Sequence, residues 1–233
     1  MDKVLNKKVT VLILCGGKGE RLRPLTDSLP KPLLHVKNRP ILSYLLDYLK
    51  KFGIEDIIIA AGYQSEKIHV FFEENHKDLN ITIIDSGDVD IIDRVRVCTP
   101  YIKDDFILLY GDTLANVMIN KLQEFHFSHD LKATITLWPF KSSFGLAELD
   151  KDGNVINFRE KPTLDQWINI GHFYFEKEVL NWMKDFTTYA EFLEFLADQK
   201  KLKAFKHHGI HITVNTFREL EDAEINIDEF KSE

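Results

Sequence analysis

The feature that most limits the folds open to this chain is an unbroken apolar run that ends in a glycine-rich loop. Residues 9–15 read VTVLILC, and residues 16–34 continue as GGKGERLRPLTDSLPKPLL. A strand that is apolar at successive positions must be covered on both faces, as the parallel strands of α/β proteins are. The segment therefore predicts a buried parallel strand, with a glycine loop at its carboxyl end.

Similar apolar runs alternate with segments of helical periodicity through the first part of the chain. Ser65 suits the N-cap of one of these helices. Strands are predicted at 9–15, 56–62, 81–85, 105–112 and 132–140, and helices at 40–53, 65–75 and 116–129. This order predicts an α/β fold with a mostly parallel, doubly wound (Rossmann-like) sheet and helices on both faces.

The pattern changes after residue 144 to short alternating strands with a turn at Asp152-Gly153. We expect a small β excursion that flanks the sheet, followed by terminal helices. The predicted strands are 144–150, 154–160 and 168–175, and the predicted helices are 176–185, 188–199 and 216–226. No linker or repeat interrupts the chain, so we expect one domain over residues 1–233.

The composition excludes several classes of protein. With 233 residues, 44% of them apolar and 29% charged, the chain can bury a sizeable core and is neither disordered nor membrane-spanning. Its net charge of −7 at pH 7 argues against nucleic acid or an anionic membrane as a partner. An anionic ligand must therefore be held by a local cluster of cations.

The N-terminal residues and the two cysteines indicate a cytoplasmic protein. Lys7 and Lys8 precede the apolar run and faintly resemble a secretion signal. The run is at the short limit for such a signal, and Leu14 stands where a small residue is needed before Cys15. Cys15 and Cys98 form no disulfide framework or zinc pattern, so we interpret both as reduced, strand-associated apolar residues.

The glycine loop matches neither common phosphate-binding fingerprint. A dinucleotide-binding G-x-G-x-x-G motif starting at Gly17 would need glycine at Leu22, and the loop lacks the spacing of a P-loop. The simpler alternative is a turn beside a solvated basic face. The continuation favours a binding site, because Pro30 and Pro32 fix the backbone around Lys31, which a solvated lysine does not require.

Three predicted strands end in residues that suit phosphates and a metal ion. Ligands of open α/β sheets bind beyond the carboxyl ends of the strands, so these ends should form one site. Glycine amides approach phosphate oxygens closely, cations neutralise them, and a carboxylate can hold a divalent cation. In the absence of a nucleophile motif, this combination predicts phosphoryl or nucleotidyl transfer. The residues are Gly16, Gly17, Lys18, Gly19, Arg21, Arg23 and Lys31, then Ser86, Gly87 and Asp88, then Tyr110, Gly111 and Asp112.

These segments resemble the sugar-phosphate nucleotidyltransferases, which transfer a nucleoside monophosphate from an NTP to a phosphate and release pyrophosphate. GGKGERLRPLT and PKPLL match the family signature G-G-x-G-x-R-L-x-P-L-T followed by P-K-P. The resemblance continues through AGYQ (61–64), YGD (110–112), FG (144–145), EKP (160–162) and INIGHFYF (168–175). It implies a nucleotide-binding part over 1–130 and an acceptor-binding part with terminal helices over 131–233.

The resemblance also implies roles for individual residues, with Mg²⁺ as the cofactor. The catalytic residues would be Arg21 on the β- and γ-phosphates, Lys31 on the α-phosphate or the incoming phosphate, Asp112 on Mg²⁺, and Lys161 on the acceptor phosphate. The nucleotide-binding residues would be Leu14, Gly16, Gly17, Gly19, Glu20, Arg21, Lys31, Gly62, Ser86, Gly87, Asp88, Gly111 and Asp112. The acceptor-binding residues would be Gly145, Glu160, Lys161, Asn169 and Gly171.

Within the family, AAGYQSEKI (60–68), IDSGD (84–88) and LLYGDTLANV (108–117) look most like glucose-1-phosphate cytidylyltransferases, which use CTP. One departure concerns the acceptor. Those enzymes carry T-G-G-R after this turn, and the register places Ile91 where their phosphate-side arginine belongs. Arg94 and Arg96 follow on a helix whose orientation the sequence leaves open. We therefore expect CTP and a small phosphorylated acceptor that is not a hexose, such as a phospho-amide or phospho-alcohol.

A second departure is Asn215, which stands where the family's late metal ligand is usually Asp. An Asn oxygen can also bind Mg²⁺, so the resemblance implies Asp112 and Asn215 as metal ligands. Alternatively, Asn215 or Thr216 caps the last helix, with Glu219 completing a capping box. The two interpretations are compatible.

Two further groups of residues have a simple structural alternative. Glu160 and Lys161 could form an ordinary exposed ion pair, although the family match favours a function. The spacing of His207, His208 and His211 gives no regular set of metal ligands, so we interpret them as pocket rim or packing.

Three hypotheses follow from the sequence. The first is a CTP-dependent transferase acting on a small phosphorylated acceptor, and the second is a hexose- or heptose-1-phosphate nucleotidyltransferase that uses another NTP. The third is a nucleotide-binding regulatory protein without activity, against which the set Arg21, Lys31, Asp112 and Lys161 argues. Nucleic acid and membranes are not expected as partners, and a homo-oligomer is left open.

Overall fold

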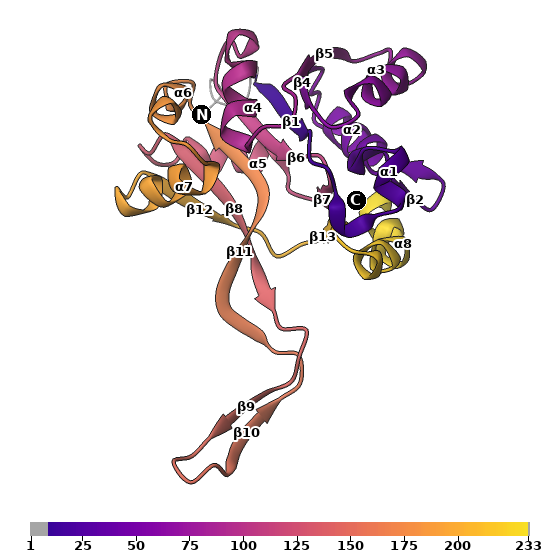
Figure 1. The fold of residues 1–233 in the computed structure, drawn as a ribbon. Helices are drawn as coiled ribbons and strands as arrows, with labels where there is room; N and C mark the ends of the chain where they lie inside the picture. The colour runs from indigo at the N-terminus through magenta and orange to yellow at the C-terminus, as the bar shows by residue number, and fades with distance from the viewer. Residues whose placement is uncertain (1–8, 233) are drawn as a thin grey trace.

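A mostly parallel seven-stranded sheet forms the centre of the computed structural model, which describes residues 9–232 (Figure 1). The strand order is β12-β8-β11-β6-β1-β4-β5. Neighbouring strands are parallel except β11, which is antiparallel to both β6 and β8. The strands are β1 (Thr10–Cys15), β4 (Asp56–Ala61), β5 (Asn80–Asp85), β6 (Phe106–Tyr110), β8 (Ala133–Lys141), β11 (Thr163–Phe175) and β12 (Leu202–Lys206).

Helices cover both faces of this sheet, so the predicted fold class is confirmed. In β1, Val11 and Ile13 point into one core, which includes residues of α2 and α8, and Leu12 points into the other, which includes residues of α4 and α7. The helices are α1 (Leu25–Ser28), α2 (Ile41–Lys51), α3 (Ser65–Glu74), α4 (Ile91–Cys98), α5 (Ile119–His126), α6 (Val179–Trp182), α7 (Tyr189–Asp198) and α8 (Phe217–Ser232).

Several local predictions were wrong. Ser65 does not cap α3, because the N-cap is Gln64 in a left-handed conformation, and the Ser65 hydroxyl instead donates to Asp85 at 2.6 Å. The single helix predicted over 176–185 is α6 followed by a 3-10 turn (Met183–Asp185). Cys98 closes α4 rather than lying on a strand, although both cysteines are free and buried as expected.

The sequence patterns also missed five strands. β12 lies at the edge of the main sheet, where its exposed residues Lys203 and Lys206 weaken the apolar signal. Two short strand pairs lie apart from that sheet. They are β2 (His35–Val36) with β3 (Arg39–Pro40), and β7 (Thr113–Ala115) with β13 (His211–Thr213).

A long β-hairpin projects from the body of the protein (Figure 1). We call residues 142–162 the arm; it contains β9 (Leu146–Leu149) and β10 (Val155–Arg159), which pair only with each other. The predicted small β excursion is therefore present, and it takes the form of this projecting hairpin. β11 begins at Thr163 instead of near residue 168, so it continues with β8 beyond the sheet and carries the arm away from it.

The structure also tests two expectations about membranes, a spanning helix and an N-terminal secretion signal. No helix within residues 9–232 is long and apolar enough to cross a membrane. Lys7 and Lys8, which suggested a faint secretion signal, lie outside the described residues. Val9 is buried and β1 begins at Thr10, so the apolar run forms the interior strand that was predicted.

Protonation of the buried His172 should make stability depend on pH. Burial lowers the pKa of His172 to about 4, below the 6.5 expected of an exposed histidine. Its stabilising contribution is therefore complete above pH 6.5 and is lost as the pH falls towards 4, by up to a few kcal/mol. We expect His172→Gln to lose less unfolding free energy than the wild type between pH 7 and 4.5 in urea titrations. The variant His69→Gln, at an exposed position, should keep the wild-type dependence.

Candidate active site

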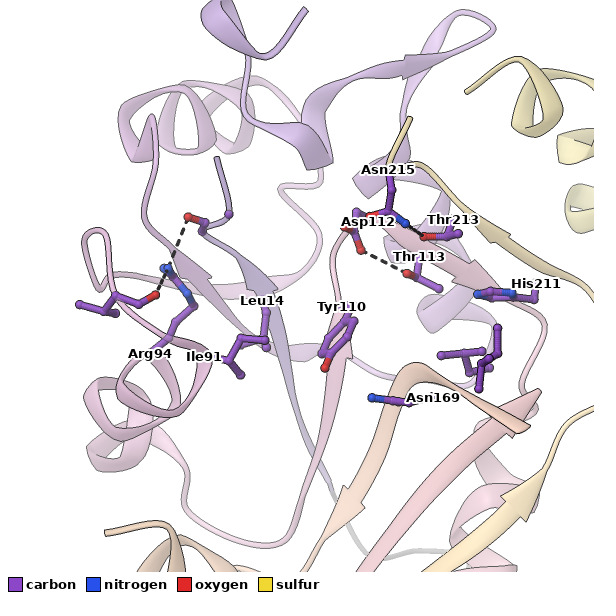
Figure 2. Close-up of a pocket in the computed structure, with 15 residues that line it drawn as sticks. Leu14, Ile91, Arg94, Tyr110, Asp112, Thr113, Asn169, His211, Thr213 and Asn215 are labelled. Carbon is purple, nitrogen blue, oxygen red and sulfur yellow. Dashed lines mark hydrogen bonds between the residues drawn. The ribbon is translucent and has the colours of Figure 1, made fainter. Parts of the chain in front are cut away.

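A pocket of about 470 Å³ lies at the carboxyl edge of the sheet, where β1 and β6 end (Figure 2). β11 passes beside β6 with His172 opposite Leu109, which brings the preceding residues of β11 to the same edge. The short pair β7–β13 forms another wall. The lining residues are Leu14, Gly16, Gly17, Val89, Ile91, Arg94, Tyr110, Asp112, Thr113, Ile168, Asn169, Ile170, His211, Thr213 and Asn215.

A buried lysine joins two lining residues of this pocket that come from distant parts of the chain. Lys31 lies in a 3-10 turn (Lys31–Leu33) that follows Pro30, and only 8% of the residue is exposed. Its Nζ donates to Oδ1 of Asn215 at 2.6 Å and to the carboxylate of Asp112. Nη2 of Arg21 donates to the same Asn215 oxygen at 3.2 Å. The structure thus brings together three of the four residues expected to be catalytic.

Asn215 and Thr216 both make hydrogen bonds at the start of the last helix. Thr216 is the residue that caps the last helix with its side chain, because its Oγ1 accepts from the Glu219 amide at 3.2 Å. The Glu219 carboxylate accepts from the Asn215 backbone amide at 2.6 Å, and the Asn215 side chain donates to Thr213 at 2.9 Å. The Asn215 amide oxygen is thereby oriented towards Lys31 and Asp112, where it can contact a cation.

The glycine loop is shaped by backbone conformation and by close packing. Gly16 and Gly17 line the pocket. Gly19 has a φ of 63°, a left-handed conformation that suits glycine, and precedes the 3-10 turn Glu20–Leu22. Glu20 is exposed and does not line the pocket. The Gly111 amide donates to the Leu14 carbonyl at 3.0 Å, which holds the ends of β1 and β6 together.

Arg94 lies beneath the glycine loop, and the sequence interpretation had left its orientation open. Only 4% of the residue is exposed. Nη1 donates to the Ala61 carbonyl at 2.8 Å and to the Ser86 hydroxyl, while Nη2 donates to the carbonyls of Val89 at 3.1 Å and Gly16 at 3.4 Å. One side chain therefore connects the segments that follow β1, β4 and β5. The sequence contained one indication of this orientation. Arg94 is four residues before the apolar Cys98 on α4, so the two side chains share a face of the helix, and both are buried.

The neighbouring Arg96 lies on a different side of α4. It pairs with Asp93 at 2.6 Å and donates to the Met183 carbonyl at 2.6 Å, outside the pocket. Of the two arginines, only Arg94 lines the pocket, and its hydrogen bonds go to the protein's own oxygens. Ile91 also lines the pocket, at the position where relatives were expected to carry arginine.

The predicted residues that follow β5, together with Gly62, lie near Arg94. Ser86 Oγ donates to the Ala61 carbonyl at 2.7 Å, and Gly62 lies against both Arg94 and the Gly87 carbonyl. Asp88 forms an exposed ion pair with Lys18. Arg94 lines the pocket, whereas Gly62, Ser86, Gly87 and Asp88 are not among its lining residues.

Asn169, which was expected on the acceptor side, lines the pocket, and Gly171 lies two residues further along β11. The Asn169 side chain accepts from the Gly171 amide at 2.8 Å, and Gly171, with a φ of 72°, lies so close to the Tyr110 ring that a Cβ would overlap it. Burial raises the pKa of Tyr110 to about 12, so its phenol stays neutral at pH 7. Ile168 and Ile170 make this wall apolar.

The three histidines of the 207–211 segment separate from one another. His211 lines the pocket, and burial lowers its pKa to about 4, so it is an uncharged imidazole at pH 7. The His207 ring contacts the Ile210 carbonyl, and His208 lies against Trp167 in another cleft. Among residues 9–232, no group of three or more His, Cys, Asp or Glu side chains is placed to hold a metal ion. The rim and packing interpretation fits these positions.

The remaining predicted residues do not reach the pocket. Gly145, Glu160 and Lys161 belong to the arm, and a Cβ on Gly145 would contact the Phe158 ring and the Glu160 carboxylate. In the described part of the chain, none of these three residues lines the pocket that contains Asp112 and Asn169. The structure thus separates the expected acceptor residues into two groups.

A mostly parallel sheet whose glycine loop, buried lysine and aspartate meet beyond the carboxyl ends of the strands is the architecture of a nucleotide-binding α/β protein. The family is set by comparison with known proteins. Residues 10–209 match the nucleotidyl transferase family model, and the chain belongs to that family.

Relatives within the family are named for the transfer of different nucleotides. The chain is 33% identical over 236 residues to a glucose-1-phosphate cytidylyltransferase of Salmonella typhimurium, covering 89% of this chain and 91% of the relative. It is 30% identical over 200 residues to a D-glycero-α-D-manno-heptose 1-phosphate guanylyltransferase of Campylobacter jejuni, covering 83% and 87%. The solved structure of HddC from Yersinia pseudotuberculosis shares the fold, with a TM-score of 0.72, 22% identity and coverage of 94% and 99%.

Two adjacent glycines of the loop should respond differently to alanine. A Cβ at Gly16 would overlap the Arg94 guanidinium, whereas a Cβ at Gly17 would meet nothing within 4 Å. Overpacking of this kind costs about 1–3 kcal/mol, and a chain of this size loses roughly 2–4 °C of Tm per kcal/mol. We expect calorimetry to show a Tm several degrees lower for Gly16→Ala and nearly unchanged for Gly17→Ala. Equal shifts would mean that Arg94 does not need the space at Gly16.

Proposed function

We propose that the protein is a Mg²⁺-dependent cytidylyltransferase that transfers CMP from CTP to the phosphate of a small phosphorylated acceptor and releases pyrophosphate. The observation that carries this proposal is the cluster in which Lys31 contacts Asp112 and Asn215 beside the glycine loop. Family membership supports nucleotidyl transfer, and the Salmonella relative supports CTP. The third hypothesis, a regulatory protein without activity, does not account for the contacts of Lys31 with Asp112 and Asn215.

The chemistry requires positioning and charge neutralisation more than a reactive side chain. A phosphate monoester carries roughly 1.5–2 negative charges at pH 7, and its oxygen can attack the α-phosphorus directly. The protein must bring two anions together and stabilise the charge of the transition state. In this proposal, amides of Gly16 and Gly17 bind the triphosphate, Arg21 binds its outer phosphates, and Lys31 neutralises the α-phosphate.

The oxygens of Asp112 and Asn215 fit a magnesium site. Both contact the same cation, the Lys31 ammonium, and the Thr113 hydroxyl donates to the second Asp112 oxygen at 3.1 Å. Mg²⁺ commonly takes one or two protein oxygens and completes its shell with phosphate oxygens and water. When bound with CTP, it would supply positive charge to the triphosphate. Asp112 and Asn215 would hold it, and Lys31 would then be released to contact phosphate.

The preference for CTP would arise from backbone carbonyls around the nucleotide. Cytosine has an amino donor where uracil has a carbonyl acceptor. Carbonyls of the turn at Ser86–Asp88, in which the Ser86 hydroxyl accepts from Arg94, would pair with the amino group and would be left unpaired by uracil. An unpaired buried polar group gives strong discrimination.

The proposed acceptor is smaller and less rich in hydroxyl groups than a hexose. Ile91, Ile168 and Ile170 contribute apolar side chains to the pocket, and the imidazole of His211 carries no charge at pH 7. These surroundings suit a phospho-amide or phospho-alcohol. A second candidate is a hexose or heptose 1-phosphate, which is favoured by the names of both curated relatives.

A substrate screen tests this function directly. Pyrophosphate release would be measured with CTP, UTP, GTP, ATP and dTTP against hexose 1-phosphates, heptose 1-phosphates and small phospho-amides and phospho-alcohols. We expect CTP with a small phosphate ester to give the highest kcat/KM. A value for glucose 1-phosphate with CTP of about 10⁴ M⁻¹s⁻¹ or more would favour the second candidate. No release with any pair would contradict nucleotidyl transfer.

Neutralising Asp112 should remove the activity without unfolding the protein. Asp112→Asn keeps the shape of the side chain but removes the only carboxylate that contacts Lys31 in the described residues. We expect a loss of kcat by at least ~10²-fold, because charge stabilisation by such a group contributes several kcal/mol. The control Asp27→Asn changes an exposed carboxylate that pairs with Arg23 near the same loop, and it should keep most activity. Unimpaired turnover of Asp112→Asn, or of the wild type in EDTA, would contradict the proposed metal site.

A further inference from the structure

The ring of His211 differs from the other buried or half-buried histidine rings of the described chain, because it makes no hydrogen bond to the protein. Within residues 9–232, neither ring nitrogen of His211 has a hydrogen-bond partner, and the ring contacts that of Trp138 instead. The other rings each bond a hydroxyl or a carbonyl through one nitrogen. They are His76 on Ser43, His126 and His129 on Thr134, His172 on Ile170, and His207 on Ile210.

The open nitrogens of His211 face the pocket. His211 is one of the lining residues, and Figure 2 shows its ring directed from β13 into the pocket, on the side away from Arg94 and Ile91. An imidazole has one donor and one acceptor nitrogen, and polar atoms that lose water without gaining a partner cost free energy. A bound molecule can supply these missing hydrogen bonds, so the position suits recognition of a ligand.

The strand pair β7–β13 fixes which side chains form this wall. Successive residues of a strand point to opposite faces. Ile212 belongs to the hydrophobic core, whereas His211 and Thr213 on either side of it line the pocket. Thr113, which pairs with Thr213 across the two strands, lines the pocket as well. The wall is therefore polar along β13, from Thr213 to His211.

Contacts on two sides hold the His211 ring in place. The Trp138 ring lies 5.2 Å from it, measured between ring centroids, and Nε1 of Trp138 is itself fixed by donating to the Gly209 carbonyl at 2.9 Å. The Asn116 side chain accepts from the amide of the preceding residue, Ile210, at 2.6 Å. A ring that is already ordered can bind a ligand without the entropic cost of being ordered on binding.

His211 lies a short distance from the residues proposed to hold phosphate and metal. Thr213 accepts from the Asn215 side chain at 2.9 Å, and Asn215 accepts from Lys31 at 2.6 Å. The Cα atoms of Thr213 and His211 are two strand residues apart, or about 7 Å. A molecule whose phosphate is held beside Lys31 can therefore reach His211 through a linker of a few atoms.

The surroundings of His211 favour an uncharged group. Ile168 and Ile170 form an apolar wall, and burial lowers the pKa of His211 to about 4, so the ring is a neutral donor and acceptor at pH 7. Among the described residues that line the pocket, Arg94 is the one cation, and its hydrogen bonds go to protein oxygens on the opposite side. A carboxylate beside His211 would lose water without gaining a cation, whereas a hydroxyl or an amide would pair with the imidazole.

We propose that His211 determines acceptor specificity by hydrogen-bonding an uncharged hydroxyl or amide group at the end of the acceptor remote from its phosphate. The inference rests on the proposed function, which places a phosphorylated acceptor in this pocket. It holds for either candidate acceptor, because a hexose also presents hydroxyl groups. It excludes acceptors that place a carboxylate at this position.

A series of matched phosphate esters tests which group His211 recognises. Propyl phosphate, 3-hydroxypropyl phosphate, 3-(phosphonooxy)propanamide and 3-(phosphonooxy)propanoate share one chain and differ at the far end. With CTP, we expect kcat/KM for the hydroxyl or amide ester to exceed that for the propyl and carboxylate esters by at least ~10-fold. If the substrate screen favours glucose 1-phosphate, its deoxy analogues take the place of the series, and removal of one hydroxyl should have the same effect.

Variants of His211 show whether this residue causes the preference. His211→Leu should abolish it by raising the KM for the preferred acceptor, with the KM for CTP close to that of the wild type. His211→Gln, which keeps a donor and an acceptor, should retain most of it. The control His208→Leu changes an exposed histidine of the same segment that lies in another cleft, and it should behave like the wild type. A preference for the carboxylate ester, or one that survives His211→Leu, would overturn the proposal.

A binding measurement on the wild type separates this inference from the function on which it rests. In protein labelled with ¹⁵N-histidine, comparison with His211→Gln identifies the ring signals of His211 by NMR. The amide ester or glucose 1-phosphate should shift these signals, and propyl phosphate should not. If they shift in this way but no substrate pair releases pyrophosphate, the recognition role stands and nucleotidyl transfer fails. If pyrophosphate is released but the signals do not respond, nucleotidyl transfer stands and the role of His211 is wrong.

Discussion

The organisation of the site depends on one buried guanidinium. Arg94 binds oxygens at the ends of β1, β4 and β5 or just beyond them, so it ties these three strand ends together. Burial lowers the pKa of Arg94 below the usual value for arginine. A buried cation held by carbonyl and hydroxyl oxygens leaves net positive charge beneath the glycine loop, which favours an anion above it.

The glycines of the loop follow from the same constraint. A side chain at Gly16 or Gly62 would occupy the volume of the Arg94 guanidinium, so absence of a Cβ is required by packing there. Gly17 has open space beside it, towards the pocket, where a ligand could approach its amide. One motif thus contains glycines of two kinds, one for internal packing and one for access to the backbone.

Much of the fold was predictable because local signals agree with the tertiary environment. The apolar run of β1, buried on both faces, and the periodicity of α2 are typical of an interior strand and a covering helix, and each lies within two residues of its predicted bounds. The strands that were missed pair through long-range contacts and are short or half exposed, as β12 and β13 are. Such strands depend on a neighbour for their hydrogen bonds, and their own residues carry little pattern.

For the site, the sequence by itself determined which chemical groups are available: the glycine loop, the proline-bounded Lys31, and Asp112 after an apolar strand. Strand ends of a parallel sheet share one edge, so their convergence followed from the order of elements. Arg94 shares a helix face with Cys98, but only the tertiary structure decided which oxygens Arg94 binds and that Asn215 turns its oxygen to Lys31, because these partners come from distant parts of the chain. It also decided that Glu160 and Lys161 stand on a projecting arm, since the length of β11 is set by pairing with β8 and not by its own residues.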